Sequence, residues 1–255
     1  MAASLQLIPL LGLPLVEPGD DVAGLIADGL DANGLALTGA DVVVIAQKIV
    51  SKAEGRYARL ADVAVSPRAE QLAAEADKDP RLVQLILDES VDILRVRPGV
   101  IIAEHRNGYV LANAGIDRSN IAVDPDDPRV LLLPVDPDAS AKAIKQSLAT
   151  SHGADTPVII NDSLGRAWRN GTVGVAIGTA GLDPLYNQIG DQDLFGNTLE
   201  VTEPAVADEL AAAASLVMGQ AAEACPVVLA RGANLRRSDA GSGSLIREKS
   251  LDMFR

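Results

Sequence analysis

Two aspartates in this 255-residue chain stand where carboxylates can do chemistry. Asp117 follows an apolar run at residues 109–112, and Asp162 follows another at residues 158–160. Each has a hydroxyl or amide side chain beside it and a glycine nearby. Residues at strand ends are held by a rigid element and reach into clefts. If the two carboxylates meet in space, they form a hard oxygen site for Mg²⁺ or Mn²⁺. The alternative is that each aspartate caps a turn.

Basic side chains provide candidates for binding an anion. Lys52 comes after the apolar run at residues 41–46, and a lysine at the carboxyl end of a strand can balance phosphate charge. Arg166 and Arg169 flank Trp168 between two glycines, where they could clamp a phosphate or carboxylate. A surface role remains open in both cases, because long basic side chains commonly lie along the surface with their heads in water.

The common nucleotide and metal motifs are missing. The chain has no GxxxxGK[ST] loop, no GxGxxG after a strand and no HExxH. Its single cysteine, Cys225, excludes an internal disulfide, and it precedes an apolar run, as a buried small side chain would. The two histidines fit no metal-ligand spacing. A nucleotide site in this chain must therefore be of a less common type.

The amino-acid composition limits the classes of partner that we expect this chain to bind. With 22 basic and 35 acidic residues the formal net charge is −13, which repels nucleic acid and anionic membranes. Aromatic residues make up only 2% of the chain, which argues against base-stacking platforms. The first basic residue is Lys48, and no apolar run is long enough for a membrane span. We expect no nucleic-acid partner, no membrane partner and a cytoplasmic location.

Strands and helices mix in the predicted element order. Apolar runs predict strands at residues 5–10, 41–46, 100–103, 109–112, 130–133, 158–160 and 172–177. Helical spacing predicts helices from residue 18 to about 30, at 66–78, from 80 to about 94, after Asp138, and at 204–217. Without strict β-α alternation, this order favours an α+β fold.

Turn and cap residues set the expected boundaries of these elements. Asn107-Gly108 predicts a β-hairpin. Asp138 and Thr202 are the expected N-caps of two helices, and Gly219 is expected to end the second of them. The proline-rich residues 124–137 are expected to cross between two subdomains.

A set of short motifs occurs in a fixed order over nearly the whole chain. They are GLP and PGDD at residues 12–21, IVSKAEGR at 49–56, NAGIDRSN at 113–120, DSLGRAWRNG at 162–171, the glycine-spaced residues 174–181, DLFG at 193–196, VADE at 206–209, MG at 218–219 and RG at 231–232. This ordered set resembles the coenzyme F420-0:L-glutamate ligase (gamma-glutamyl ligase) family in its stand-alone form. Some relatives carry an added flavin-binding domain, which we do not expect in this chain. The resemblance implies one ligase domain over residues 1–255, made of two interleaved, unlike α/β subdomains, and an intertwined homodimer.

The resemblance also implies an activity. It is the GTP- and divalent-metal-dependent ligation of L-glutamate to coenzyme F420-0, a lactyl phosphodiester deazaflavin, through an acyl phosphate, giving F420 with one or more γ-linked glutamates. Two other classes stay open at this stage. One is a metal-dependent phosphohydrolase that uses the same carboxylates with water as acceptor, and the other is a non-catalytic acidic oligomer that binds a nucleotide for regulation.

The resemblance to the family also implies roles for individual residues at the matching positions of this sequence. GTP contacts are implied for Leu11, Gly12, Leu13, Pro14, Gln47, Lys48, Lys52, Asn120, Met218, Gly219, Gln220 and the turn that continues to Cys225. Asp117 and Asp162 would hold one Mg²⁺ or Mn²⁺, Ser163 and Gln220 would help hold a second, and K⁺ is a further cation to consider. Asp117, Asp162 and Lys52 are the implied catalytic residues.

Four positions depart from the pattern of relatives, two of them from the pattern of many relatives and two from that of some. Ser163 replaces a threonine and keeps the hydroxyl, whereas Gln220 replaces a glutamate and leaves the second cation less neutralised. Gln47 and Lys48 replace a Ser-Thr type pair, so their contacts with GTP carry over less directly.

Overall fold

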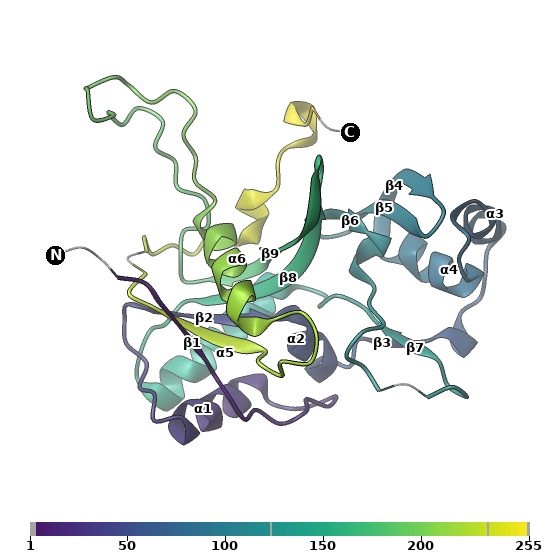
Figure 1. The fold of residues 1–255 in the computed structure, drawn as a ribbon, viewed down its shortest axis with the longest axis horizontal. Helices are drawn as coiled ribbons and strands as arrows, with labels where there is room; N and C mark the ends of the chain where they lie inside the picture. Colours follow the sequence, from purple (N-terminus) through teal and green to yellow (C-terminus); the bar gives the residue numbers. More distant parts are fainter. Residues whose placement is uncertain (1–3, 123, 234, 254–255) are drawn as a thin grey trace.

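A computed structural model of the chain describes residues 4–122, 124–233 and 235–253. Helices and strands are mixed without regular alternation, which confirms the expected α+β class. The elements form two groups, a large sheet with its covering helices and a smaller group built from residues 57–131 (Figure 1). Over the described residues, none of the helices combines the length and the apolar character that crossing a membrane requires. The cytoplasmic location stays a prediction.

The large sheet has five strands. In spatial order they are β1 (Gln6–Pro9), β10 (Val227–Arg231), β2 (Asp41–Ala46), β8 (Val158–Arg166) and β9 (Arg169–Ala180). The pair β2 and β8 runs parallel, and each other neighbouring pair in this sheet runs antiparallel. The first five residues of β2 are buried, as expected for a central strand that is covered on both faces.

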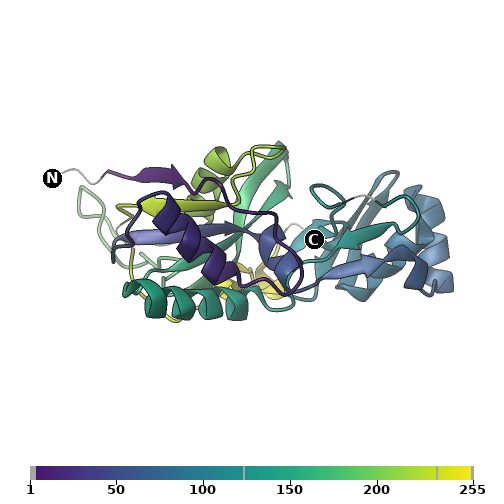
Figure 2. The same cartoon turned by 90° about the horizontal axis from the view of Figure 1, so that it is seen from below.

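Helices cover both faces of this sheet. Val43 points into a core shared with α1 (Val22–Ala32) and α5 (Pro137–His152). Its neighbour Val44 points to the opposite face, where α6 (Val206–Met218) packs. This alternation follows from the pleat of the strand. Figure 2 shows α1 and α5 on one side of the sheet and α6 on the other.

Residues 57–131, called the small lobe from here on, contain two further sheets. The first pairs β3 (Tyr57–Arg59) with β7 (Arg129–Leu131), and the second is a meander of β4 (Ser90–Arg97), β5 (Val100–His105) and β6 (Val110–Ala112). The remaining elements are α3 (Pro67–Ala76), α4 (Pro80–Asp88) and the 3-10 turns η1 (Leu60–Asp62) and η2 (Asn113–Gly115). The two helices pack on β5 around buried Ala73, Ile86 and Ile101, so the lobe has its own apolar core.

The two chain segments that join the lobe to the large sheet are bonded to each other. The Leu132 amide donates to the Arg56 carbonyl at 3.0 Å. Arg56 also donates through Nε to the Leu133 carbonyl at 2.8 Å and forms an ion pair with Glu89 at 2.9 Å. The entry and exit segments are therefore fixed against each other.

Several boundaries match the sequence-based prediction. The β5–β6 hairpin turns at Asn107-Gly108, where Gly108 has a φ of +90° that favours glycine. Gly219 is the C-cap of α6, as predicted, whereas α1 begins only at Val22, after its N-cap Asp21, and not at residue 18. Cys225 is buried, as predicted.

Other boundaries were predicted wrongly. The helix predicted from residue 80 to about 94 ends at Asp88, because residues 90–97 pair with β5 as strand β4. The strand predicted at residues 158–160 continues to Arg166, so Asp162 and Ser163 lie inside β8 and not in a loop after it. In both cases pairing with the next strand along the chain overrides the local pattern.

Two predicted caps were also wrong. The N-cap of α5 is Asp136, which accepts from the Ala139 amide at 3.0 Å. Asp138 instead accepts bonds from the Thr179 and Ser242 amides, and so ties α5 to β9 and to the C-terminal segment. Helix α6 begins after Ala205, which is its N-cap, so Thr202 does not cap it.

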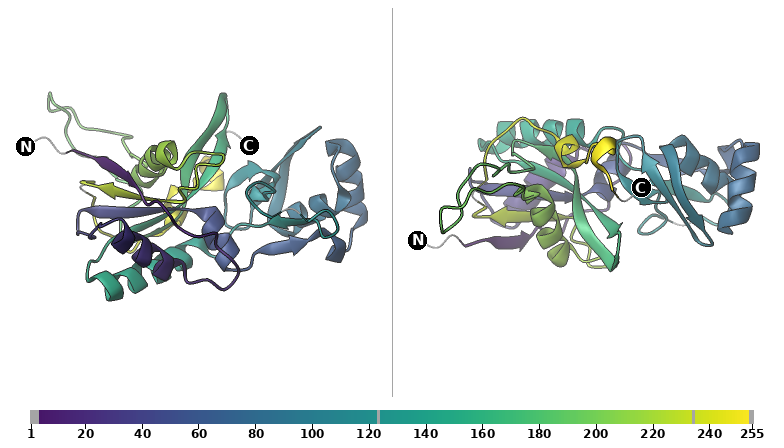
Figure 3. Two further views of the ribbon diagram at one scale, coloured as in Figure 1. Left: turned by 60° about the horizontal axis from the view of Figure 1, so that its bottom comes forward. Right: turned by 90° about the horizontal axis from the view of Figure 1, so that it is seen from above.

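Two long segments lie outside these layers. The first, residues 187–203 between β9 and α6, is called the arm from here on, and it extends away from the large sheet (Figure 3). The second follows β10 and contains the 3-10 turns η3 (Ser242–Leu245) and η4 (Lys249–Leu251), which lie near the β8–β9 hairpin.

Candidate active site

Four segments of the large sheet meet at one edge. Strands β2 and β8 are parallel, with Ala46 opposite Asn161, so the residues that follow both positions lie together. Strand β10 starts at the same edge, because Val227 pairs with Ile45, and β1 ends there, because Pro9 pairs with Val228. This topology brings together the implied GTP-contact residues 11–14, 47–48 and 218–220 with Asp162.

Asp117 reaches this edge from the small lobe. An isolated bridge with Leu131 holds its backbone, with N···O distances of 3.0 and 2.9 Å. Its carboxylate accepts from the Lys48 ammonium at 2.6 Å and from the Ser119 amide at 2.7 Å. Burial raises the pKa of Asp117, but the hydrogen bond and charge of Lys48 outweigh this, and the pKa is lowered.

Lys48 lies at the start of α2 (Gln47–Ala53), directly after β2. Besides Asp117 it donates to Ser119 Oγ at 2.8 Å and to the Ser119 carbonyl at 3.2 Å. Lys48 therefore joins the large sheet to the small lobe across the site. Ser119 was not singled out from the sequence, although it lies in the family motif at residues 113–120.

Asp162, which belongs to β8, lies at the same edge of the large sheet as Asp117 and Lys48. Burial raises the pKa of Asp162 to about 6, and the Asp117 charge adds to the effect. The Ser163 amide, the Lys48 charge and a hydrogen bond with Gln47 act in the opposite direction. The structure thus brings the two predicted carboxylates close enough to influence each other's ionisation, with Lys48 beside both.

The side chains implied for a second cation also lie together. Ser163 Oγ donates to Gln220 Oε1 at 2.8 Å, and Gln220 Nε2 donates to Ser215 Oγ at 3.0 Å. Asn120 donates to the Ala221 carbonyl at 3.1 Å, which connects the small lobe to the turn after α6. Met218, the last residue of α6, is buried, and its Sδ accepts from Asn161 Nδ2 at 3.5 Å.

Residues 11–14 form an exposed loop after β1. The Leu11 carbonyl accepts from Asn33 Nδ2 at 3.0 Å, and Gly12 has a φ of +80°. No atom lies within 4 Å of the position where a Cβ would stand on Gly12. This open backbone leaves room for a ligand to approach.

Lys52 is placed differently from the prediction. It lies in the last turn of α2, one turn beyond Lys48, and not at the end of β2. Burial lowers the pKa of Lys52, and the nearby Lys48 charge lowers it further, while Glu17 raises it. Lys48 and Lys52 are one turn apart and so lie on the same face of this short helix.

The Arg166, Trp168 and Arg169 cluster does not join this site. It forms the turn of the β8–β9 hairpin, and Trp168 is 86% exposed. Arg166 lies four residues along β8 from Asp162, which is roughly 13 Å in an extended strand. Its guanidinium donates to carbonyls of its own turn, at 3.4 and 3.5 Å.

The oxygen atoms at the site suit a divalent cation. Within residues 4–122, 124–233 and 235–253, no three His, Cys, Asp or Glu side chains gather into a metal-binding group. A cation would therefore take Asp117 and Asp162, a neutral oxygen such as Ser163 Oγ, and further oxygens from ligand and water, as Mg²⁺ commonly does. The raised pKa of Asp162 fits this role, because a cation would relieve the repulsion between the carboxylates.

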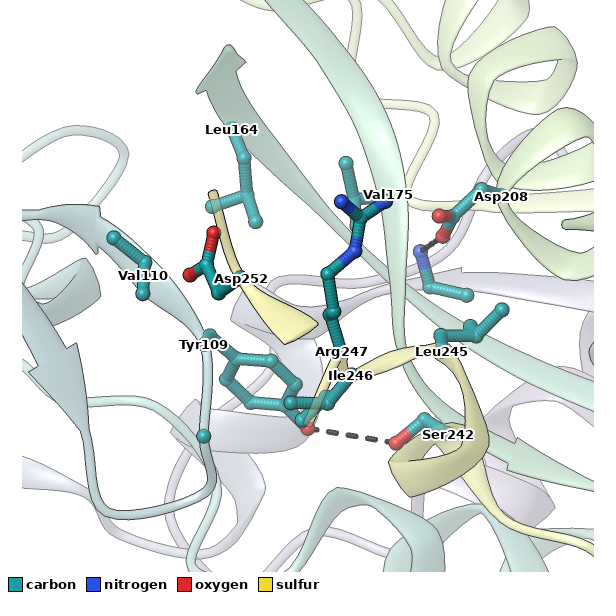
Figure 4. A pocket seen from close by; sticks show the side chains of 12 residues that line it. Tyr109, Val110, Leu164, Val175, Asp208, Ser242, Leu245, Ile246, Arg247 and Asp252 are labelled. Carbon is teal, nitrogen blue, oxygen red and sulfur yellow. Dashed lines mark hydrogen bonds between the residues drawn. The ribbon is translucent and has the colours of Figure 1, made fainter. Parts of the chain in front are cut away.

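A cavity of about 230 Å³ is lined in part by Val175, the cross-strand partner of Asp162. It lies between the β8–β9 hairpin, the β5–β6 turn of the small lobe and the C-terminal segment, and Figure 4 shows its side chains. Tyr109, Leu164 and Asp208 are among these side chains, and none of the three was predicted as a site residue from the sequence. These residues come from distant segments, so only the folded chain reveals them.

Taken together, the fold and the site define an α+β protein with paired carboxylates and lysines at the edge of a sheet. The family model for the F420-0:gamma-glutamyl ligases matches residues 11–232. The chain therefore belongs to this family of amide-bond-forming enzymes, and the resemblance stated from the sequence is confirmed.

Relatives agree with this assignment. A protein named coenzyme F420:L-glutamate ligase from Methanothermobacter thermautotrophicus is 49% identical over 253 residues, which cover 98% of this chain and 99% of the relative. The protein of the same name from Methanopyrus kandleri is 45% identical over 94% of this chain and 93% of its own length. A third, from Methanocaldococcus jannaschii, is 41% identical over 96% and 95%.

Proposed function

We propose that this chain ligates L-glutamate to coenzyme F420-0, consuming GTP and requiring a divalent cation. The observation that carries the proposal is the meeting of Asp117, from the small lobe, with Asp162, from the large sheet, beside Lys48. The names of the relatives, which align over nearly their whole length, supply the substrates.

The first step activates a carboxylate. An oxygen of the F420-0 carboxylate attacks the γ-phosphorus of GTP, the bond to the β,γ-bridging oxygen breaks, and GDP leaves with that electron pair. The product is an acyl phosphate. The transferring phosphoryl group carries negative charge on its oxygens, which positive side chains stabilise. Lys48 and Lys52 provide these charges from adjacent turns of α2.

The second step forms the amide. The α-amine of L-glutamate attacks the carbonyl carbon of the acyl phosphate, phosphate leaves, and the amine nitrogen loses a proton. When bound, a divalent cation would neutralise charge on the phosphate oxygens. Asp117 and Asp162 would hold it, and Ser163 with Gln220 would contribute to a second position; Mg²⁺, Mn²⁺ and K⁺ are the ions to test.

Bond networks keep these groups in position. The Asn120–Ala221 bond and the contacts of Lys48 with Asp117 and Ser119 hold the small lobe against the large sheet. The reacting groups would therefore meet between two parts that are already fixed, which lowers the entropy cost of their alignment.

A homodimer is part of the same proposal. At the tip of the arm, Leu194 is 99% exposed and Phe195 is 89% exposed. The tip is ordered by Asp193, whose carboxylate accepts from the Phe195 and Asn197 amides at 2.8 Å each. An ordered turn that presents two apolar side chains to water is typical of an interaction site, and a second copy of this chain is the partner we propose.

Mass spectrometry tests the activity directly. We expect the protein, incubated with F420-0, GTP, L-glutamate and Mg²⁺ or Mn²⁺, to add one glutamate residue per ligation and to release GDP and phosphate. Reactions without F420-0 or without glutamate are the controls. Steady GTP hydrolysis in both controls, with no amide product, would favour the phosphohydrolase. No turnover at all would favour a regulatory nucleotide-binding protein.

A further inference from the structure

The cavity next to Asp162 shares a face of the β8–β9 hairpin with that carboxylate. Val175, which lines the cavity, is the direct cross-strand partner of Asp162, and such pairs have side chains on the same face. Leu164, also a lining residue, lies two positions along β8, which is roughly 7 Å. The Asp162 charge also raises the pKa of Tyr109, on the opposite wall. The cavity therefore adjoins the candidate site.

Its walls are mainly apolar and include one aromatic ring. One side is formed by Leu164 and Val175, and another by Leu245 and Ile246 of the C-terminal segment. The ring of Tyr109 forms a further part of the wall (Figure 4). The Tyr109 hydroxyl donates to the Ile177 carbonyl, so the ring is fixed in orientation. Burial raises the pKa of Tyr109 to about 12, so the phenol stays neutral. A fixed neutral ring among aliphatic side chains suits a flat, uncharged ligand.

The charged residues that line the cavity include both positive and negative side chains. Arg247 brings one positive charge, whereas Asp208 and Asp252 bring two carboxylates. Asp208 accepts from the Ala176 amide at 2.9 Å, and burial raises its pKa. A dicarboxylate such as glutamate would meet like charge here, whereas a ring with an N–H group could donate to Asp208.

The volume limits how much of a ligand can enter. About 230 Å³ is less than the roughly 300 Å³ at the lower end for pockets that enclose a whole drug-sized ligand. The cavity therefore suits one part of a longer molecule, whose remainder continues toward Asp162.

We infer that this cavity binds the planar ring system of the deazaflavin acceptor, with the acceptor's chain and carboxylate extending along β8 to the Asp117–Asp162 site. This inference rests on the proposed function and adds the acceptor-binding residues to it. The C-terminal segment then forms part of a substrate site. It is held there by the Lys249–Glu104 ion pair at 2.8 Å and by the packing of Ile246 against Gly108.

Two pairs of variants test the cavity. Tyr109→Leu and Tyr109→Phe both lose the hydroxyl bond to Ile177, but only the leucine loses the aromatic face. Leu245→Trp fills the cavity, whereas Ser244→Trp places the same ring at an exposed neighbouring position that does not line it. The thermal unfolding transition of each variant confirms that it is folded.

The measurement is fluorescence titration of a deazaflavin riboside, which has the ring but lacks the phosphate and lactyl groups, without GTP, metal or glutamate. We expect the parent, Tyr109→Phe and Ser244→Trp to bind it alike, and Tyr109→Leu and Leu245→Trp to bind it about tenfold more weakly. Equal binding by all five proteins, or no binding by the parent, overturns the inference. Because ligation by the parent is assayed separately, a parent that binds the ring in this pattern without forming an amide would refute only the proposed function.

Discussion

The carboxylates of Asp117 and Asp162 have similar sequence surroundings but opposite pKa shifts. Both are desolvated, and desolvation raises a carboxyl pKa. Asp117 receives a direct hydrogen bond from Lys48 at 2.6 Å, which lowers its pKa. Within the residues that the structure describes, no basic side chain forms an ion pair with Asp162, and its pKa is raised to about 6. A bound cation would therefore shift the ionisation of Asp162 toward the carboxylate form more than it shifts the ionisation of Asp117.

Asp162→Asn and Asp117→Asn should each lower turnover on the order of 10²–10³-fold, the range for losing one preorganised electrostatic group. The fold should persist. For Asp162→Asn the unfolding temperature should hold or rise, because a buried, repelled carboxylate is removed. Cation binding by calorimetry and GTP consumption check this, with Asp62→Asn, an exposed aspartate, as control. If both site variants unfold and the parent shows no response to metal, the two aspartates have a structural role and do not bind a cation.

Lys52→Ala should raise the barrier for GTP consumption by about 2–4 kcal/mol, because the lysine acts where phosphoryl charge redistributes. Lys52→Arg should rescue poorly, since a planar guanidinium does not replace a compact ammonium. Steady-state rates at saturating glutamate and metal measure both variants. A surface lysine would give two silent substitutions, and that result would remove Lys52 from the site.

At the scale of elements, Glu89 connects two segments of the small lobe to Arg56, in the segment that enters the lobe. It pairs with Arg56 at 2.9 Å and with Arg106 at 2.6 Å, and His105 Nε2 lies 3.5 Å from its carboxylate. Burial raises the pKa of Glu89, but His105 and the two arginines outweigh it, and the pKa is lowered. Because the folded pKa is lowered, ionised Glu89 stabilises the fold above the ordinary glutamate pKa, and this stabilisation is lost as the pH falls through the folded value.

Glu89→Gln should therefore lower the free energy of unfolding by about 2 kcal/mol at pH 7, the size of a hydrogen-bonded charge contact. The difference from the parent should shrink below about pH 4, where glutamate protonates in the unfolded chain. Urea unfolding at a series of pH values measures it. A difference that stays constant from pH 7 to pH 3 would show that charge is not its origin.

The contact between α6 and the hairpin depends on a glycine. A Cβ added at Gly174 would lie 2.4 Å from the Ala211 carbonyl oxygen and 2.5 Å from Asn161 Oδ1. Gly174→Ala should cost about 1–3 kcal/mol, because the helix must move. At Gly165, in the same hairpin, nothing lies within 4 Å of the added Cβ, so Gly165→Ala is the matched control and should be nearly neutral. Equal unfolding midpoints for the two variants would contradict the close packing of α6.

Elements with strong local patterns could be predicted from the sequence. Strand β2 was predicted with its observed bounds because its apolar run is uninterrupted, and the β5–β6 hairpin because Asn-Gly favours its turn. The polar half of β8 was missed, because Asn161, Asp162 and Ser163 extend the strand only through pairing with β9. Similarly, residues 90–94 follow helical spacing but pair with β5.

At the scale of the whole molecule, the sequence identified the family and supplied candidate site residues, but not how these residues meet. Asp117 and Asp162 lie 45 positions apart in the numbering, and tertiary contacts, among them the Leu132–Arg56 and Lys48–Asp117 bonds, set the lobe against the sheet. The cavity beside Asp162 combines residues from the lobe, the hairpin and the C-terminal segment. No local pattern contains that information, because each of these contacts is tertiary.

The arm gives a prediction about assembly. Leu194 and Phe195 are exposed at its tip, yet the Asn197 side chain donates to Asp193 at 2.9 Å and keeps the turn ordered. An ordered apolar tip loses little entropy on binding, and a two-fold axis would bury two such tips reciprocally. The parent should therefore sediment as a dimer at micromolar concentration, and the double variant Leu194→Ser with Phe195→Ser as a monomer.

The control for the arm is Val91→Ser, which removes an exposed apolar side chain from the small lobe and should leave the dimer unchanged. The arm forms its own internal bonds, so the double variant should unfold near the temperature of an isolated parent monomer, and the loss of stability should depend on protein concentration. Sedimentation velocity and thermal unfolding over a hundredfold concentration range test both points together. A parent that is monomeric and fully active would remove the dimer from the proposal, and a double variant that remains dimeric would place the interface elsewhere on the surface.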